Sequence, residues 1–273
     1  MKLVDLFCGS GGFSLGAHHA GFEVAAAFDI DPILTSSFSR NFPNTKLHLA
    51  DVSKLTGEEV KWAAGGEVGG LFGGPPCQGF SDIGRRDVND ERRKLLGHFF
   101  RLVKEVRPAF FIMENVPGLA YQDARSELDD AINIVADAYE LVGPHVWDAA
   151  QFGAPTKRRR IFVVGYDRER CDRLTLEDIA ALKQAPASVA DAIIDLKDAR
   201  QVDDVDGFDT WKITRKGQPR CYARTLRTRN GLFTGHKATI HTQKVIDRFA
   251  LVPHPFPQVS SSRTFLAYGS RSG

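Results

Sequence analysis

Short β-rich runs alternate with helical patterns over the first two-thirds of the chain, and this order limits the possible folds more than any other feature. The expected strands are Leu3–Phe7, Val24–Phe28, Lys46–Leu49, Gly69–Phe72, Ala109–Met113 and Ile161–Tyr166. The expected helices are Asp31–Asn41, Glu91–Val106, Asp123–Tyr139 and Asp191–Arg200. Strands that alternate with helices form parallel sheets flanked by those helices. The sequence therefore predicts an α/β fold with a Rossmann-like, mostly parallel sheet.

The pattern loosens after about residue 170, where we place a domain boundary between residues 1–170 and a smaller, irregular region, 171–273. The charge changes as well, because residues 151–273 contain 22 Lys and Arg against 13 Asp and Glu. Within them, Lys212–Lys237 holds eight basic residues and no acidic one. Such a segment is attracted to a polyanion, since neutralising phosphates releases counterions. A solvated basic loop would explain the same charges equally well.

Hydropathy and cysteine spacing exclude several classes of protein. The longest apolar runs, such as Ala109–Met113, are far shorter than the ~20 residues of a membrane span, and the first residues show no signal-peptide pattern. The cysteines at positions 8, 77, 171 and 221 form no CxxC pair, so neither a zinc site nor a disulfide framework is expected. We therefore expect a soluble, cytoplasmic protein with reduced thiols and no metal.

A glycine-rich turn and acidic residues are expected at one edge of the sheet. The turn Phe7–Gly12 follows the first strand, and its glycines let the backbone approach a ligand closely. Asp29, followed by Ile30, ends the second strand, where an acid can accept both hydroxyls of a ribose. Asp51, followed by Val52, ends the third, where an acid can accept from an adenine amino group. These positions favour an adenosine ligand, although a dinucleotide enzyme would also explain the glycines and Asp29.

Cys77 stands in the sequence Gly-Gly-Pro-Pro-Cys-Gln-Gly-Phe-Ser, directly after the fourth strand. The loop is therefore expected at the same sheet edge as the adenosine site. Pro75 and Pro76 restrict the backbone before the thiol, and Gly79 and Ser81 let the chain beyond it move. This arrangement suits a nucleophile on a closing loop. A single cysteine is more often a small core residue, but this segment has the composition of a turn.

Glu114 and a run of arginines complete the expected site. Glu114 follows the apolar residues of the fifth strand, and partial burial there favours its neutral, proton-donating form. In the strand that begins near Arg158, alternation directs Arg158 and Arg160 to one side and Arg159 to the other. These arginines can hold a ligand oxygen or form a solvated or phosphate-binding patch. Cys77 and Glu114 should face each other across one crevice.

In this order, the segments resemble the motifs of the cytosine-5 DNA methyltransferase family over roughly residues 1–170. The matching motifs are Phe-x-Gly-x-Gly-Gly, Pro-Cys-Gln, Glu-Asn-Val and Gln-x-Gly-x-Pro followed by Arg-x-Arg. The resemblance implies the fold of S-adenosylmethionine-dependent methyltransferases, with S-adenosyl-L-methionine as cofactor and S-adenosyl-L-homocysteine as product. The implied cofactor site comprises Phe7, Gly9, Ser10, Gly11, Gly12, Asp29, Ile30, Asp51, Val52, Pro76 and Leu95.

The resemblance also implies a reaction, methylation of carbon 5 of a cytosine that is flipped out of double-stranded DNA. Carbon 5 is a poor nucleophile, so Cys77 would first add to carbon 6 and make the ring enamine-like. Glu114 would bond ring nitrogen 3 and the exocyclic amine, Arg160 would hold the base oxygen, and Arg158 would steady the catalytic loop or a phosphate. The implied DNA contacts are Gln78, Ser81, Arg85, Arg86, Arg220, Arg224, Arg227 and Arg229.

Two late motifs of the family, a Pro-Arg-Glu-like helix and a Gly-Asn-x-Val segment, have no match after Thr264–Gly269. We expect either that a second polypeptide supplies them or that the chain is truncated and impaired. An exposed apolar patch at the docking place would itself drive association. The resemblance thus implies a methyltransferase of a bacterial modification system. A non-catalytic DNA-binding subunit of the same fold and a tRNA cytosine-5 methyltransferase are the alternatives.

Overall fold

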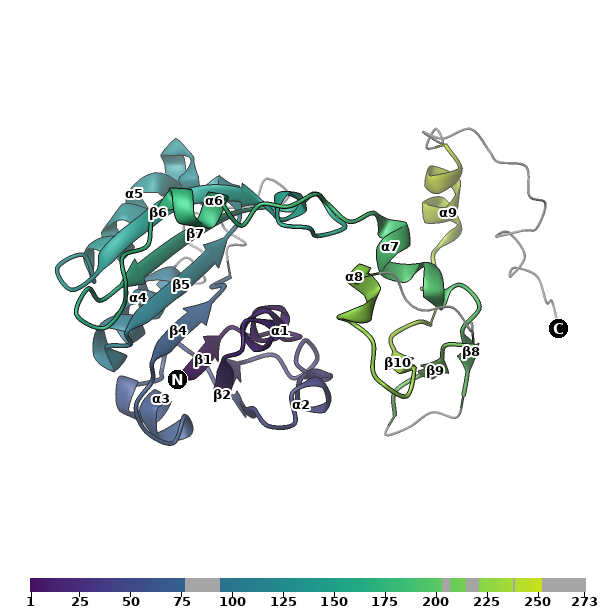
Figure 1. The fold of residues 1–273 in the computed structure, drawn as a ribbon, viewed down its shortest axis with the longest axis horizontal. Coiled ribbons are helices and arrows are strands. Elements are labelled where there is room, and N and C mark those ends of the chain that lie inside the picture. The colour runs from purple at the N-terminus through teal and green to yellow at the C-terminus, as the bar shows by residue number, and fades with distance from the viewer. Residues whose placement is uncertain (77–93, 203–206, 215–220, 238, 252–273) are drawn as a thin grey trace. The chain divides into compact units, whose positions relative to one another are not determined.

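The computed structural model describes residues 1–76, 94–202, 207–214, 221–237 and 239–251, without the side chains of residues 122, 123 and 221 (Figure 1). These residues form two compact units. The first runs from Met1 to Ile194 and includes helix α8 (Cys221–Arg224). The second begins at Asp195 and contains a small antiparallel sheet and helix α9 (Gln243–Ala250).

The first unit is built on a seven-stranded sheet in the order β3-β2-β1-β4-β5-β7-β6. Its strands are β1 (Lys2–Leu6), β2 (Glu23–Asp29), β3 (Lys46–Leu49), β4 (Gly70–Gly73), β5 (Phe110–Asn115), β6 (Glu140–Asp148) and β7 (Arg159–Tyr166). The five strands from β3 to β5 are parallel, and β7 runs antiparallel to both β5 and β6. The predicted α/β fold with a mostly parallel sheet is confirmed, and the six predicted strands are present with ends shifted by at most two residues.

Helices cover both faces of this sheet (Figure 1). The helices of the first unit are α1 (Gly12–His19), α2 (Phe38–Asn41), α3 (Gly57–Ala63), α4 (Lys94–Val106), α5 (Gln122–Asn133), α6 (Leu176–Ala180), α7 (Val189–Ile193) and α8, with the 3₁₀ turns η2 (Pro117–Ala120) and η3 (Ala149–Gln151). On one face, α3, α4 and α5 enclose the main core, which includes Phe99, Phe111 and Leu128. On the other face, α1 packs Phe13 and Ala17 against the sheet.

The predicted helix Asp31–Asn41 is wrong over most of its length, because only Phe38–Asn41 is helical. The Asp31 carboxylate accepts hydrogen bonds from the backbone N–H groups of Ile33 and Leu34, at 2.7 and 3.1 Å. Asp side chains favour such turns because they satisfy nearby backbone donors directly. The segment after β2 is therefore a series of turns that leads into α2.

The predicted helix Asp123–Tyr139 is too long, and the strand that follows it was not predicted. The helix ends at Asn133, and Glu140–Asp148 forms the edge strand β6. Gly143 and Pro144 interrupt the alternation of this strand, and its register against β7 shifts at that point. Irregular spacing of this kind hides a strand from a pattern of period two.

The predicted helix Asp191–Arg200 is wrong at both ends. Helix α7 begins at Val189, because the Ser188 side chain caps it by accepting from the Asp191 backbone N–H at 3.1 Å. A 3₁₀ turn, η4 (Ile194–Leu196), follows, and Arg200 already belongs to a strand. The beginning of the other predicted helix, Glu91–Val106, lies outside the described residues.

The sheet of the second unit has the order β10-β9-β8, with all pairs antiparallel. Its strands are β8 (Arg200–Gln201), β9 (Thr210–Lys212) and β10 (Leu232–Thr234). In the part of the chain that the structure describes, no helix is long and apolar enough to cross a bilayer. The same residues include no group of three His, Cys, Asp or Glu side chains that could hold a metal ion.

Candidate active site

A cavity of about 760 Å³ lies on the face of the large sheet that α1 covers. Its wall includes the glycine-rich turn after β1, Gly74 after β4, the end of β5 and the paired strands β6 and β7. The residues that sequence analysis predicted for the site and that line this cavity are Phe7, Gly9, Ser10, Gly12, Glu114, Arg158 and Arg160. The cavity therefore brings together parts of the expected cofactor and base sites.

The glycine-rich turn has an unusual backbone. Phe7, Gly9 and Gly11 have φ angles of 60°, 50° and 91°, in the left-handed region that favours glycine. Phe7 is not a glycine, and such a conformation costs about 1–3 kcal/mol in general. A Cβ atom on Gly11 would lie 2.2 Å from the Phe42 ring. The turn thus depends on small residues, and it places the first residues of α1 at the cavity.

Asp29 holds the glycine-rich turn against the end of β2. Its Oδ2 atom accepts from the Gly9 backbone N–H and its Oδ1 atom from the Asp31 backbone N–H, each at 2.9 Å. The residue is 9% exposed, whereas its neighbour Ile30 is 67% exposed. A carboxylate oxygen can accept more than one hydrogen bond, so Asp29 can still bind hydroxyl groups. The exposed side chain of Ile30 is therefore an apolar surface next to the Asp29 carboxylate.

Asp5 is a site residue that sequence analysis did not select. Its Oδ2 atom accepts from the Ser14 hydroxyl at 2.6 Å, and its buried Oδ1 atom has no hydrogen-bond partner among the described residues. Burial is the main cause that raises its pKa from 3.8 to about 7. Asp5 also contributes to the cavity wall. The available signal was an acid flanked by the apolar residues Leu3-Val4 and Leu6-Phe7, because a buried carboxyl needs a partner.

Glu114 lies near the end of β5, and its carboxylate forms an ion pair with the Arg160 guanidinium, with Oε1 and Nε 2.8 Å apart. Both side chains are about three-quarters buried, at 24% and 22% exposure. Burial raises the pKa of Glu114, and the positive charges of Arg160 and Arg158 oppose this increase. The pKa of Glu114 is raised overall, and this favours the protonated form of the carboxyl, which can donate a proton, as the sequence predicted.

The chain that leads to Cys77 is fixed beside Glu114. A Cβ atom on Gly74 would lie 3.0 Å from Glu114 Oε2, so this glycine permits close contact with the carboxylate. The buried Asn115 side chain donates from Nδ2 to the Pro75 carbonyl oxygen at 3.1 Å. Glu114 and Asn115 both come from the end of β5. Cys77 itself lies outside the described residues.

Two arginines reach the cavity from the start of β7. Arg158 and Arg160 line it, although Arg158 is also exposed, whereas Arg159 is exposed and is not part of its wall. The Asp148 carboxylate accepts from the Arg158 backbone N–H at 2.9 Å and so fixes the turn between β6 and β7. Arg160 pairs in register with Trp147 of β6. The alternation inferred from the sequence is thus present in the structure.

Aromatic rings form one wall of the cavity, which sequence analysis did not predict. The Trp147 ring lies 5.6 Å from Phe162 and 6.4 Å from Phe152, and Phe13 lies 6.5 Å from Phe162. Phe162 pairs in register with Glu114, so the apolar wall borders directly on the charged pair. Residues from three separate segments meet here, and no local pattern could have grouped them.

The remaining cofactor candidates lie elsewhere in the first unit. Asp51 and Val52 form the turn after β3, where the Val52 side chain is buried in the main core. Pro76 and Leu95 are half-buried at the two ends of the segment that the structure does not describe. None of these four lines the cavity, and neither do Gly11, Asp29 and Ile30.

Two of the four thiols are described, and both are poor nucleophiles. Burial and the nearby carboxylates of Asp5 and Asp29 raise the pKa of Cys8. Burial also raises the pKa of Cys171, whose Sγ lies 3.4 Å from the Ala109 carbonyl oxygen. A reactive cysteine requires the thiolate, so these environments suit structural residues.

Of the DNA-contact candidates, Gln78, Ser81, Arg85, Arg86 and Arg220 lie outside the described residues. Arg224 and Arg229 are exposed. Arg227 binds the Asp195 carboxylate in the second unit with two contacts of 2.8 Å, and the two side chains are only 13% and 6% exposed. This bidentate pairing also lowers the pKa of Asp195. Arg227 therefore has a structural role within its own unit.

Comparison with known proteins places this chain in a family. The C-5 cytosine-specific DNA methylase family model matches residues 1–241. The Type II methyltransferase M.XorII of Xanthomonas oryzae is 35% identical over 268 residues, covering 91% of this chain and 62% of the relative. The Type II methyltransferase M.DdeI of Desulfomicrobium norvegicum is 32% identical, covering 92% and 61%. The chain thus spans about three fifths of the length of these relatives.

Solved structures show the same relationship. A crystal structure described as that of a DNA modification methyltransferase encoded within an E. coli prophage is 32% identical and superposes with a TM-score of 0.73. The match covers 92% of this chain and 75% of that one. The family resemblance that the sequence motifs indicated is therefore confirmed, and the chain belongs to the C-5 cytosine-specific DNA methylase family.

Proposed function

We propose that the protein transfers a methyl group from S-adenosyl-L-methionine to carbon 5 of a cytosine in double-stranded DNA, as part of a bacterial modification system. The observation that carries the proposal is the buried Glu114–Arg160 pair in a cavity of about 760 Å³, beside the chain that leads to Cys77. The names of the relatives, Type II methyltransferases, support the same reaction. The proposed setting is the bacterial cytoplasm, where the DNA is.

The residues present fit S-adenosyl-L-methionine, which supplies an electrophilic methyl group when bound. The unpartnered Oδ1 atom of Asp5 suits the ammonium group of its amino-acid part, because a buried carboxyl without a partner is unfavourable until a donor arrives. The turn Phe7–Gly12 would bind the middle of the molecule through close backbone contacts. Asp29 would accept from the ribose hydroxyls. The product S-adenosyl-L-homocysteine would keep all of these contacts.

The adenine would lie at the ends of β2 and β3. The exposed Ile30 side chain offers an apolar surface for the ring, and Asp51 would accept from its amino group. The Val52 backbone would contact the ring edge, with Pro76 and Leu95 nearby. The residues that the sequence analysis selected at the ends of β2 and β3 thus form one proposed subsite for the adenine.

Cys77 is the proposed nucleophile. Adjacent Cα atoms are about 3.8 Å apart, so connectivity alone keeps the Cα of Cys77 within about 8 Å of the Cα of Pro75, which Asn115 binds beside Glu114. The thiolate adds to carbon 6 of the cytosine, and the electron pair of the C5–C6 double bond becomes available at carbon 5. Carbon 5 then takes the methyl group. A base removes the carbon 5 proton, and the returning electron pair expels the thiolate.

Glu114 and Arg160 would stabilise the charge that the thiolate pushes into the ring. A protonated or shared carboxyl at Glu114 donates to ring nitrogen 3, and its other oxygen accepts from the exocyclic amine. Arg160 binds the base oxygen and limits how far the pKa of Glu114 rises. Arg158, which lines the same cavity, would bind a phosphate or the catalytic loop. Because Glu114 and Arg160 are about three-quarters buried, their contacts with the base would be stronger than in water.

The DNA must release the target base from its stack, since the cavity cannot admit a paired cytosine. We propose that Gln78, Ser81, Arg85 and Arg86 contact the DNA near the flipped base. The region after residue 170, including Arg220, Arg224 and Arg229, would bind phosphates or read bases. Arg227 is excluded from this proposed set because it pairs with Asp195.

A second polypeptide is also part of the proposal. The aromatic side chains of Phe13, Trp147, Phe152 and Phe162 line the cavity, and we propose that an apolar segment from another chain packs against them. Such a segment would close the cavity beside Asp5 and the glycine-rich turn. Activity of the chain alone, compared with activity after addition of a candidate partner, tests this part directly.

The nucleophile assignment has a simple test. We expect Cys77→Ala to abolish transfer of labelled methyl groups to cytosine-containing DNA while binding of S-adenosyl-L-homocysteine changes less than about twofold. Cys171→Ala, in a thiol that burial keeps protonated, is the matched control and should retain activity. Methyl transfer by Cys77→Ala would reject the assignment, and transfer to tRNA in preference to DNA would reject the substrate.

A further inference from the structure

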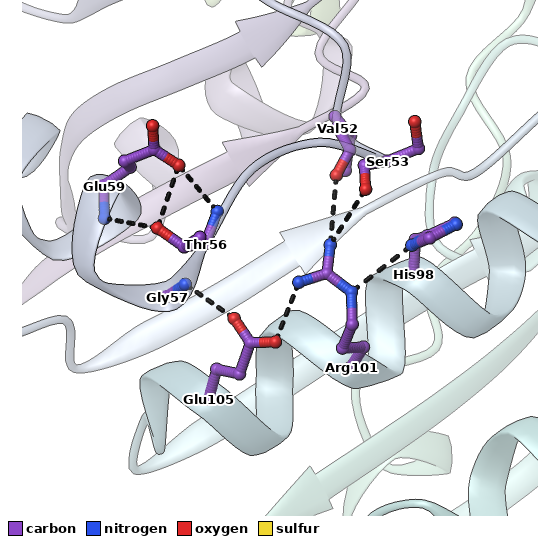
Figure 2. Close-up of polar contacts among 8 residues, drawn as sticks. All are labelled: Val52, Ser53, Thr56, Gly57, Glu59, His98, Arg101 and Glu105. Atoms are coloured by element: carbon purple, nitrogen blue, oxygen red, sulfur yellow. Dashed lines mark hydrogen bonds and ion pairs between the residues drawn. The ribbon is translucent and has the colours of Figure 1, made fainter.

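One face of α4 binds the turn that carries Asp51. His98, Arg101 and Glu105 are spaced three and four residues apart, so they lie on the same side of the helix. Figure 2 shows Arg101 pointing toward the Val52 and Ser53 carbonyl groups, Glu105 pointing toward Gly57 at the start of α3, and His98 on the other side of Arg101. The three residues belong to neither the cavity nor the motifs that sequence analysis selected.

Arg101 is held in one orientation by its neighbours on the helix. Its Nη1 atom lies 2.8 Å from Glu105 Oε1, and its Nε atom donates to His98 Nδ1 at 3.3 Å. Burial and the charge of Arg101 lower the pKa of His98, so the imidazole stays a neutral acceptor. The Arg101 and Glu105 side chains are 31% and 36% exposed, so solvent does not fully screen the pair.

Glu105 also fixes the first turn of α3. Its Oε2 atom accepts from the Gly57 backbone N–H at 2.7 Å. A Cβ atom on Gly57 would lie 2.6 Å from Glu105 Cβ, so the two helices meet closely at a glycine. Glu105 thereby holds Arg101 and the segment after the Asp51 turn at once (Figure 2).

The guanidinium of Arg101 faces two carbonyl oxygens of the Asp51 turn. Its Nη2 atom lies 3.4 Å from both the Val52 and the Ser53 carbonyl oxygen. On the other side of the turn, Asp51 Oδ1 accepts from the Ser53 backbone N–H at 3.0 Å and from its hydroxyl at 2.7 Å. Each of these four contacts is weak or moderate in strength, but together they restrict the conformation of the Asp51–Ser53 turn.

Among the residues that the structure describes, the second oxygen of the Asp51 carboxylate forms only a long ion pair with an exposed lysine. This Oδ2 atom lies 3.8 Å from the ammonium of Lys54, which is 82% exposed. Hydrogen bonds from Ser53 lower the pKa of Asp51, so the group is a charged acceptor at neutral pH. A charged acceptor such as Asp51 can select a ligand amino group only if the carboxylate itself is held in a fixed position.

We propose that Arg101 is a positioning residue that sets the selectivity of the adenosine subsite for adenine, acting through the Asp51–Ser53 turn. The inference rests on the proposed binding of S-adenosyl-L-methionine. It adds that recognition of the 6-amino group depends on a side chain that contacts no ligand. Loss of Arg101 frees the Val52 and Ser53 carbonyl groups, and Asp51 then loses its fixed direction.

The test compares two ligands, S-adenosyl-L-homocysteine and the analogue whose purine carries hydrogen in place of the 6-amino group. Their dissociation constants are measured by calorimetry with the wild-type protein, Arg101→Met, Arg101→Lys and Arg125→Met. Arg125 forms a similar i, i+4 ion pair with Asp129 on α5, at 2.8 Å, and serves as the matched control. Thermal unfolding confirms that each variant is folded.

We expect the wild type to prefer S-adenosyl-L-homocysteine by about tenfold, the value of one hydrogen bond to a charged acceptor. Arg101→Met and Arg101→Lys should reduce this preference to about twofold or less, with binding of the analogue nearly unchanged. Arg125→Met should keep the full preference. Equal weakening of both ligands, or a preserved preference in the Arg101 variants, would overturn the inference. If the wild type bound both ligands equally, the proposed hydrogen bond between Asp51 and the 6-amino group would be wrong. If it bound neither ligand, the proposed function would be wrong.

Discussion

The carboxyl of Asp5 is buried in an apolar strand, and this single residue gives the fold a pH dependence. Burial raises its pKa from 3.8 to about 7, so in that pH range the folded protein holds a proton that the unfolded chain has released. Its contribution to stability is therefore fully present below about pH 4 and is lost as the pH rises to about 7. The same group is the proposed partner of the cofactor ammonium.

Asp5→Asn should remove this dependence. In urea unfolding experiments between pH 4 and 7, the wild type should lose stability relative to the variant by up to about 1.4 kcal/mol per pH unit, the value of one proton. The comparison isolates Asp5, because Glu114 and every other titrating group are the same in both proteins. Parallel stability curves for the two proteins would show that Asp5 is ionised throughout this range.

Among the secondary-structure elements, the junction between β1 and α1 depends on a glycine. Gly11→Ala would place a Cβ atom 2.2 Å from the Phe42 ring, at a φ angle of 91° that alanine rarely adopts. Gly16, on the same helix, has nothing within 4 Å of its Cβ position.

We therefore expect opposite effects from two identical substitutions. Gly11→Ala should destabilise the protein by about 1–3 kcal/mol, from backbone strain and overpacking, and should weaken cofactor binding. Gly16→Ala should stabilise it by about 0.5–1 kcal/mol, because alanine favours a helix interior. Chemical denaturation of both variants measures the difference. If the two substitutions changed the stability equally, the glycine-rich turn would be able to accommodate a side chain at position 11.

The elements also show where sequence reasoning succeeds. Strands with continuous apolar runs, such as β2 and β5, were predicted nearly to their ends, because burial on both faces requires that composition. Strand β6 was missed, since Gly143 and Pro144 break its pattern. Helix α3 was missed although its Thr56 and Glu59 form a capping box, a signal that the sequence does contain.

At the scale of the whole molecule, the sequence could suggest the residues that we propose carry the chemistry, but it could not suggest the residues that support them. The residues at the carboxyl ends of β1, β4 and β5 meet because parallel strands bring those ends to one edge, and Gly74 and Glu114 accordingly line one cavity. Arg101 and Trp147 reach their places through packing between distant segments. Such contacts depend on three-dimensional geometry, which local patterns do not encode.

The basic region should divide into structural and DNA-contacting arginines. Arg227→Met leaves Asp195 buried without its partner and should destabilise the second unit by about 3–5 kcal/mol. Arg229→Met should leave stability nearly unchanged and reduce the slope of log affinity for DNA against log salt by about one. Unfolding experiments and salt-dependent DNA binding measure the two effects. The assignment would be wrong if Arg229→Met unfolded the protein or if Arg227→Met left its stability unchanged.

The proposed covalent role of Cys77 can be tested by trapping on DNA that contains 5-fluorocytosine. Fluorine replaces the proton that must leave carbon 5, so the thiolate cannot be expelled after methyl transfer. We predict a stable complex in the presence of S-adenosyl-L-methionine and a candidate partner chain, in which mass spectrometry finds the DNA attached to Cys77. The complex should be absent with Cys77→Ala and present with Cys171→Ala. Methylation of ordinary DNA without any trapped complex, or attachment to a different residue, would contradict the account.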